Sequence, residues 1–157
     1  MSTDIEHSEP DLQAVSFRLH NELYALNILD VQEIIKPLQI THVPLSPHWI
    51  AGVINLRGQI LPLIHLSSRL GLAKAPIARS TRFIIARHRD RRIGMVVDEV
   101  LEVLRMYNET MEPPPAHLEH REYIEQVSKQ ERGMAMILNL NKILTYHTPQ
   151  EAAEEPL

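Results

Sequence analysis

Histidine is the residue of this chain best suited to chemistry, with nine copies in 157 residues. His117 and His120 are three positions apart after a proline run, and His42 and His48 flank a loop. A zinc site needs further carboxylate or thiolate ligands that converge with the imidazoles. No such set accompanies these histidines, and the chain has no cysteine. We therefore interpret them as surface residues and expect no metal site.

The remaining polar residues do not form a recognisable pattern of catalytic residues. No serine is framed by glycines as in a nucleophile elbow, and no triad is evident. Asp98 and Glu99 are adjacent carboxylates, but neighbours on a strand point to opposite faces of a sheet. The absence of cysteine also excludes disulfides and thiolate catalysis. We predict a protein that is not an enzyme and binds no cofactor.

The segment from Arg87 to Arg92 is a dense basic turn that could bind RNA, since small barrels often do. The formal net charge of −4 weighs against bulk nucleic-acid binding. One Trp and two Phe leave few side chains on which bases could stack. We favour a solvated hairpin tip, and RNA binding stays as the alternative.

The run GVINLRGQILPLIHL, residues 52–66, carries the strongest signal. Two strand-like apolar stretches flank Arg57 and Gly58, and Gly58 is suited to the positive φ of a tight hairpin turn. Arg57 then faces water or a partner from a rigid scaffold. The pattern indicates recognition.

Short strands dominate the rest of the chain. Alternating or apolar runs predict strands at 14–20, 23–26, 81–87, 93–97, 100–106, 123–129 and 133–138. Residues 28–35 fit either a helix or a strand, 48–51 read as one helical turn, and 67–70 and 140–144 as short helices. Such spacing without long helices indicates an all-β barrel or sandwich fold.

Residues 62–70 and 136–144 echo each other at an offset of 74 residues, since Pro62 corresponds to Met136. In each copy a strand runs into a polar residue, a leucine and a short amphipathic turn. We infer two similar small barrels, each closed by the same device.

The domain is expected to span 13–146. Residues 1–12 and the acidic 147–157 are expected to be disordered tails. The first residues lack the pattern of a secretory signal, and no apolar stretch nears the roughly 20 residues of a membrane span. We expect a soluble, cytoplasmic protein without membrane insertion.

The run at 52–66 resembles the signature of CheW-type domains. VQEI at 31–34, IGMVVDEVLEVL at 93–104 and MAMILNLNKIL at 134–144 follow in the family's order. The resemblance implies two five-stranded SH3-like β-barrels packed around a shared core. It further implies a non-enzymatic adaptor between chemoreceptor signalling tips and the regulatory domain of a CheA-type histidine kinase, within a bacterial chemosensory array.

The same resemblance implies which residues bind these partners, and we expect Glu33 to pair with Arg57. Where the family commonly has acidic residues this chain has His65 and Asn139. The output, flagellar chemotaxis or a divergent array that controls pili or surface sensing, stays open. The implied partner-binding residues are Val31, Glu33, Gly52, Asn55, Arg57, Gly58 and Val103.

Overall fold

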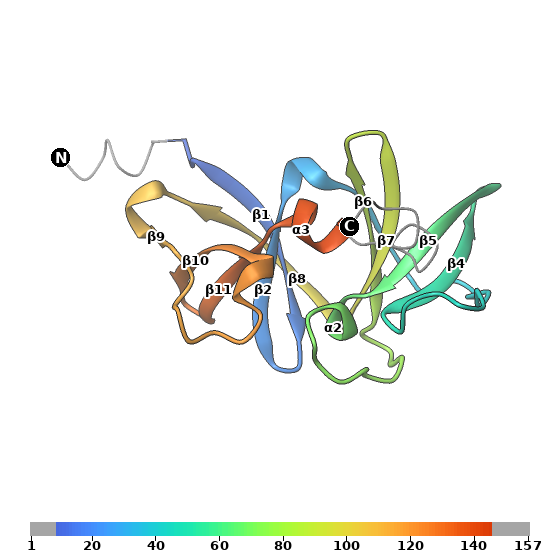
Figure 1. Cartoon of the computed structure of the whole chain (residues 1–157). Helices are drawn as coiled ribbons and strands as arrows, with labels where there is room; N and C mark the ends of the chain where they lie inside the picture. The colour runs from blue at the N-terminus through green and yellow to red at the C-terminus, as the bar shows by residue number, and fades with distance from the viewer. Residues whose placement is uncertain (1–8, 146–157) are drawn as a thin grey trace, which may run out of the picture.

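The computed structural model describes residues 9–145, which form a mainly β molecule of two halves side by side (Figure 1). The predictions for residues 1–8 and 146–157 lie outside the described residues. The first strand begins before the expected domain boundary at 13, because Leu12 already pairs with Met106. The predicted all-β fold class with short helices is confirmed.

The strands alternate with short turns and few helical residues. The strands are β1 (Leu12–Leu19), β2 (Glu22–Asn27), β3 (Val31–Ile35), β4 (Ile50–Leu56), β5 (Gln59–His65), β6 (Arg82–His88), β7 (Arg91–Val97), β8 (Glu99–Met106), β9 (Met111–Glu112), β10 (Ile124–Gln130) and β11 (Gly133–Leu138). The helical elements within the described residues are the 3-10 turns η1 (Ile28–Asp30), η2 (Asn108–Thr110) and η3 (Arg121–Tyr123) and the α-helices α2 (Leu66–Arg69) and α3 (Leu140–Leu144).

The two sheets have equivalent strands in the same order, and the first sheet has one further strand, β9, at its edge. The first half has the order β8-β1-β2-β11-β10-β9, and the second half has β3-β6-β7-β5-β4. In each, one parallel pair, β2 with β11 or β7 with β5, joins two antiparallel parts. We call the first sheet with α3 the first half, and the second sheet with α2 the second half.

The two halves are related by a circular permutation. In the second half the edge strand β3 comes first and the hairpin β6-β7 comes last, whereas in the first half the equivalent hairpin β1-β2 stands at the start of the chain. The register agrees as well, since Leu63 lies opposite Gly94 as Ile137 lies opposite Ala25. The echo noted in the sequence is therefore a true structural repeat.

After each of the edge strands β3 and β8, the chain crosses to the opposite edge of its sheet. Thr41, after β3, exchanges two backbone hydrogen bonds with Val53 on β4, of 2.9 and 2.8 Å. In the first half β9, after β8, pairs with β10 in the same way, Glu112 facing Val127. These crossings bring the two edges of each sheet toward each other, so that residues of β3 can meet the β4-β5 turn.

A shared core lies between the halves. Its largest members include Phe17 and Tyr24 from the first half and Ile84 and Met95 from the second. Each sheet also covers a smaller cluster of its own. One strand contributes side chains to the shared core and to the smaller cluster, because side chains at successive positions point to opposite faces. Apolar runs in these strands therefore signal burial on both faces, and the predicted shared core is confirmed.

Local structure mostly follows the sequence patterns. The ambiguous segment 28–35 divides into η1 and the strand β3. Asn27 accepts a hydrogen bond from the Leu29 amide and so starts η1. The helical turn expected at 48–51 is wrong, because Ile50 already opens β4, where it pairs with Ile64. Among the described residues, no helix is long and apolar enough to cross a bilayer.

Candidate docking surfaces

The β4-β5 turn presents Arg57 at the outer end of the second half. Arg57 has φ 50° and Gly58 φ 86°, and two positive φ values in a two-residue turn are the type I′ geometry that suits a β-hairpin. The Asn55 side chain accepts a hydrogen bond of 2.8 Å from the Gly58 amide, which closes the turn. The predicted hairpin and the positive φ of Gly58 are confirmed.

Arg57 is held by a carboxylate from the opposite edge of the sheet. Its Nη2 atom lies 2.5 Å from Oε1 of Glu33 on β3. The Arg57 side chain is 67% exposed, whereas that of Glu33 is 29% exposed. The expected pair is therefore present, and it holds a mostly solvated guanidinium at the turn.

A second arginine links neighbouring strands close to this pair. Arg92, at the start of β7, donates to Gln32 on β3 at 2.7 Å and to Gln59 on β5. Arg92 thus belongs to the scaffold of this end of the molecule. The basic turn that ends in Arg92 is consequently not one uniform patch of free cations.

Gly52 and Val31 have structural roles that the resemblance did not reveal. Gly52 is buried at φ 144°, and a Cβ there would lie 2.3 Å from the carbonyl oxygen of Thr41. Val31 is half-buried against the shared core. The backbone of Gly52 and the packing of Val31 set the positions of β4 and β3. Their predicted contact with a partner stays a prediction.

Val103 lies in the other half of the molecule from Glu33 and Arg57, and its predicted contact with a partner stays a prediction. It sits on β8, an edge strand of the first sheet, with 51% of its surface exposed. The strand order of the two sheets places β3 and β8 in different halves.

The circular permutation explains why both edge strands carry similar residues. VQEII at 31–35 and VLEVL at 100–104 occupy equivalent positions on β3 and β8. Ile34 faces Ile84 as Val103 faces Val15, and both Ile34 and Val103 are exposed hydrophobic residues.

Glu102, the counterpart of Glu33, also binds an arginine from a hairpin turn. Its Oε1 atom lies 3.1 Å from Nε of Arg132, in the β10-β11 turn. This second pair was not predicted from the sequence, because VQEII and VLEVL lie outside the two segments that resemble each other at an offset of 74 residues. The pattern V-x-E followed by two aliphatic residues was the signal that could have found it.

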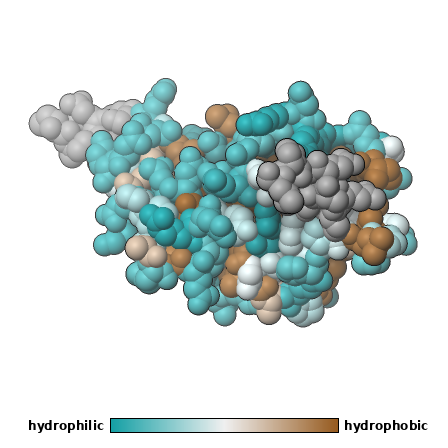
Figure 2. Space-filling model, viewed as in Figure 1, coloured by the Kyte–Doolittle hydropathy of each residue, from teal (hydrophilic) through white to brown (hydrophobic). Residues whose placement is uncertain are grey.

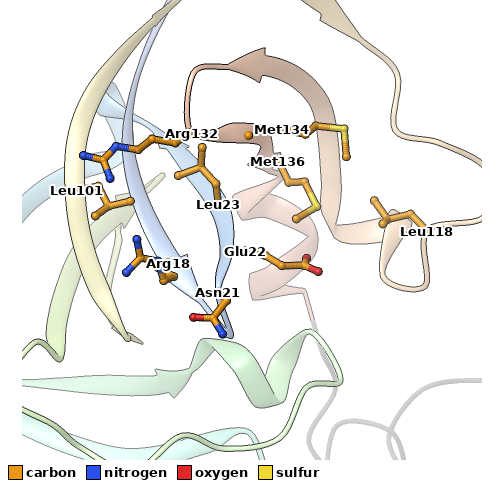
Figure 3. Close-up of a pocket in the computed structure, with 10 residues that line it drawn as sticks. Arg18, Asn21, Glu22, Leu23, Leu101, Leu118, Arg132, Met134 and Met136 are labelled. Atoms are coloured by element: carbon orange, nitrogen blue, oxygen red, sulfur yellow. The ribbon is translucent and has the colours of Figure 1, made fainter.

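Beside Arg132 the first half has an open pocket of about 320 Å³. Figure 3 shows side chains from β1, β2, β8, β11 and the loop with Leu118 around a common opening. Charged groups border this opening beside an apolar lining. The apolar members are Leu23, Leu101, Leu118, Met134 and Met136, and the charged ones are Arg18, Glu22 and Arg132.

Exposed aliphatic side chains also mark the second half. Ile60, opposite Asn55 in the hairpin, is 62% exposed, and Ile34 on β3 is 39% exposed. In Figure 2 hydrophobic side chains gather at the end where β4 and β5 lie. Apolar surface beside a fixed charge suits a protein partner.

The histidines do not form a metal site within residues 9–145, where no group of three or more potential ligands is found. His42, His48 and His117 are exposed as expected. The surface interpretation is wrong for His120, which is buried and lies 2.9 Å from the Tyr24 hydroxyl. Burial, with a smaller contribution from Glu22, raises the pKa of Tyr24.

His65 stands at the N-cap of α2 and makes no capping hydrogen bond through its side chain. Its counterpart Asn139 caps α3 by accepting from the Lys142 amide at 3.1 Å. Burial and the nearby charge of Lys74 lower the pKa of His65, while Asp98 acts in the opposite sense. His65 is therefore a weak cap that resists protonation.

The order of these motifs and the two-sheet fold identify the family. The family described as CheW-like domain matches residues 13–147. This chain belongs to the CheW-like domain family. The resemblance drawn from the sequence motifs is thereby confirmed.

Relatives of this CheW-like protein include proteins named for chemotaxis. It is 34% identical over 140 residues to the chemotaxis protein CheW of Helicobacter pylori, covering 88% of this chain and 85% of that protein. It is 32% identical to the chemotaxis protein CheW of Bacillus subtilis over 157 residues, or 99% of each.

A solved structure agrees with the fold. The crystal structure of the scaffolding protein TtCheW from Thermoanaerobacter tengcongensis superposes with a TM-score of 0.81 at 36% identity. The match covers 87% of this chain and 94% of that one. The expected function class, a scaffold of the CheW family, is confirmed at the level of the family.

Proposed function

We propose that this protein is a non-enzymatic adaptor that joins chemoreceptor signalling tips to the regulatory domain of a CheA-type histidine kinase. It acts in the cytoplasm, where it reaches receptor arrays through its partners. The observation that carries the proposal is the Arg57 side chain, exposed at a turn and aimed by Glu33.

Stability alone does not account for Arg57. A residue other than glycine in the left-handed region costs roughly 1–2 kcal/mol, and Arg57 has φ 50°. An exposed ion pair returns only about 0–1 kcal/mol. Asparagine would suit this position of the turn better. A residue that the fold does not need here, but holds in one orientation, fits a role in binding.

The two halves offer one docking surface each. The surface of the second half comprises Glu33, Asn55, Arg57 and Gly58, with Ile34 and Ile60 beside them. The surface of the first half comprises Glu102, Val103 and Arg132, with the pocket of Figure 3 beside them. The family resemblance implies that the kinase regulatory domain has the same fold, so that it can pack half against half. The resemblance also implies a helical receptor tip, which can lay its apolar residues on exposed aliphatic surface.

The test replaces Arg57 by asparagine and measures binding of the isolated kinase regulatory domain and of receptor-bearing membranes. Arg89→Asn is the matched control, because Arg89 also opens a hairpin turn of the second sheet with positive φ, 58°. An arginine at the centre of an interface contributes about 2 kcal/mol or more, so Arg57→Asn should weaken binding of at least one partner about 30-fold. Arg89→Asn should bind as the parent does.

Unchanged binding of both partners by Arg57→Asn would refute the assignment of Arg57. Equal losses in the two variants would point to general attraction by positive charge. A well-folded parent protein that binds neither partner, and leaves kinase autophosphorylation unchanged in the presence of receptors, would refute the adaptor function itself.

A further inference from the structure

Arg69, at the end of α2, ties the second half to the first. Its guanidinium lies 4.3 Å from the ring centre of Trp49 and 5.0 Å from that of Tyr123. Trp49 precedes β4 in the second half, and Tyr123 precedes β10 in the first. The guanidinium therefore lies over one aromatic ring from each half, an arrangement that favours a cation.

The hydrogen bonds of the Arg69 side chain to the described residues all go to the first half. Nε donates to the carbonyl of Ile143 at 2.8 Å, and Nη2 donates to those of Lys142 at 3.3 Å and Thr145 at 2.8 Å. Nη1 donates to the Tyr123 hydroxyl at 3.1 Å. The carbonyls belong to the last turn of α3 and to its C-cap Thr145, where backbone acceptors lack partners within the helix.

This contact is not reproduced in the other copy of the internal repeat. At the offset of the repeat, Arg69 corresponds to Ile143, which is fully buried in the shared core. The contact that Arg69 of α2 makes with α3, which we call the clamp, therefore has no counterpart at the equivalent position in α3. His88 and Asn141, 3.2 Å apart, make another polar contact between the halves, and it is exposed, as are the two hydrogen bonds that Nη2 of Arg69 donates.

The clamp differs in kind from the apolar contact around it. Burial of apolar surface holds the halves together but is non-directional. Hydrogen bonds to three carbonyls and one hydroxyl, made by a planar fork, depend on angle as well as distance. A directional contact of this kind is able to fix how one half is rotated relative to the other.

We propose that Arg69 is a positioning residue that sets the relative orientation of the two halves and hence of their two docking surfaces. This inference rests on the proposed function for its consequence in binding. Partners that each contact one surface still bind a variant at Arg69. Simultaneous binding, which requires both surfaces at one mutual angle, is impaired.

The first measurement needs no partner. Because the parent chain lacks cysteine, spin labels can be placed at Arg87→Cys in the second half and Lys129→Cys in the first, both exposed positions. Electron paramagnetic resonance then gives the distance distribution between the halves. Arg69→Gln should broaden or shift it, and Arg69→Lys, which keeps the charge but loses the fork, should have a smaller effect.

Arg82→Gln is the matched control, since Arg82 also donates to two backbone carbonyls, those of Arg79 and Thr81, but within its own half. Its distance distribution should equal that of the parent. A folded Arg69→Gln protein with an unchanged distribution would overturn the inference. Should Arg69→Gln fail to fold by circular dichroism, Arg69→Lys decides, and an unchanged distribution in that variant overturns the inference equally.

The second measurement compares binding to each partner alone with assembly of all three components. Arg69→Gln should keep each single dissociation constant within about twofold and lower the yield of the ternary assembly roughly tenfold, since avidity requires that both sites be reachable together. A loss of single binding equal to the loss of assembly would make Arg69 merely structural. If the parent binds neither partner, the adaptor proposal fails, while the distance measurement still tests the orientation of the halves.

Discussion

Replacing Gly52 by alanine tests whether the close approach of the backbone at Gly52 stabilises the second half, which carries one of the docking surfaces. Gly52 has φ 144°, a backbone conformation that residues with a side chain rarely adopt. A Cβ there would lie 2.3 Å from the oxygen and 2.9 Å from the carbon of the Thr41 carbonyl. Both atoms belong to the backbone, so no side-chain rotation relieves the clash.

The cost has two parts. Alanine in this region of φ and ψ costs about 1–3 kcal/mol in backbone strain. Relief of the clash requires Thr41 to move away from β4, which breaks its two hydrogen bonds with Val53. At a net value of about 0.5–1.5 kcal/mol each, this adds about 1–3 kcal/mol. Gly52→Ala should therefore lower the free energy of unfolding by about 2–6 kcal/mol.

Gly133→Ala separates the two parts, because Gly133 has φ 132° but a Cβ added to it would meet no described atom within 4 Å beyond its chain neighbours. It should lose only the strain, about 1–3 kcal/mol. Urea denaturation with both midpoint and slope measures each variant. Equal losses in the two variants would show that the close approach of Thr41 does not matter, and the reasoning would fail.

Two further changes test buried titratable groups. The lowered native pKa of His65 means that, below its ordinary value of 6.5, the unfolded chain takes up a proton first, so stability falls as pH drops through that region. His65→Asn should remove this pH dependence and raise the free energy of unfolding by about 1 kcal/mol, because asparagine can cap α2 as Asn139 caps α3. Denaturation at pH 5.5 and 7.5 measures both effects. An unchanged dependence of stability on pH would contradict the assignment to His65. Tyr24→Phe leaves the buried His120 imidazole without its hydroxyl partner and should cost about 1–3 kcal/mol in urea denaturation; a loss below about 0.5 kcal/mol would show that the bond is not stabilising.

Local features of the fold were predictable from the sequence. Alternation located β1, a turn of Arg57 and Gly58 defined the β4-β5 hairpin, and the strand-then-helix echo anticipated α2 and α3. These patterns depend on neighbours within a few residues, whose side chains take sides according to the period of the strand. The motif order also sufficed to identify the family.

The assembly of the candidate docking surfaces was only partly predictable. The pair of Glu33 with Arg57 was anticipated, but the placement of Val103 in the other half was not. Nothing near Glu102 in the sequence specifies that its partner is Arg132. The helical turn expected at 48–51 shows how pairing with β5 overrides a weak local signal.

The sequence by itself determined which segments become strands, where the hairpins turn and which faces are apolar. The tertiary structure alone decided that VQEII and VLEVL occupy equivalent edges, that each half has its own glutamate–arginine pair, and that Arg69 reaches across to α3. The physical reason is that local periodicity fixes the face of each side chain, whereas the order of strands in a sheet fixes which distant faces meet, and that order is settled by packing of the whole chain.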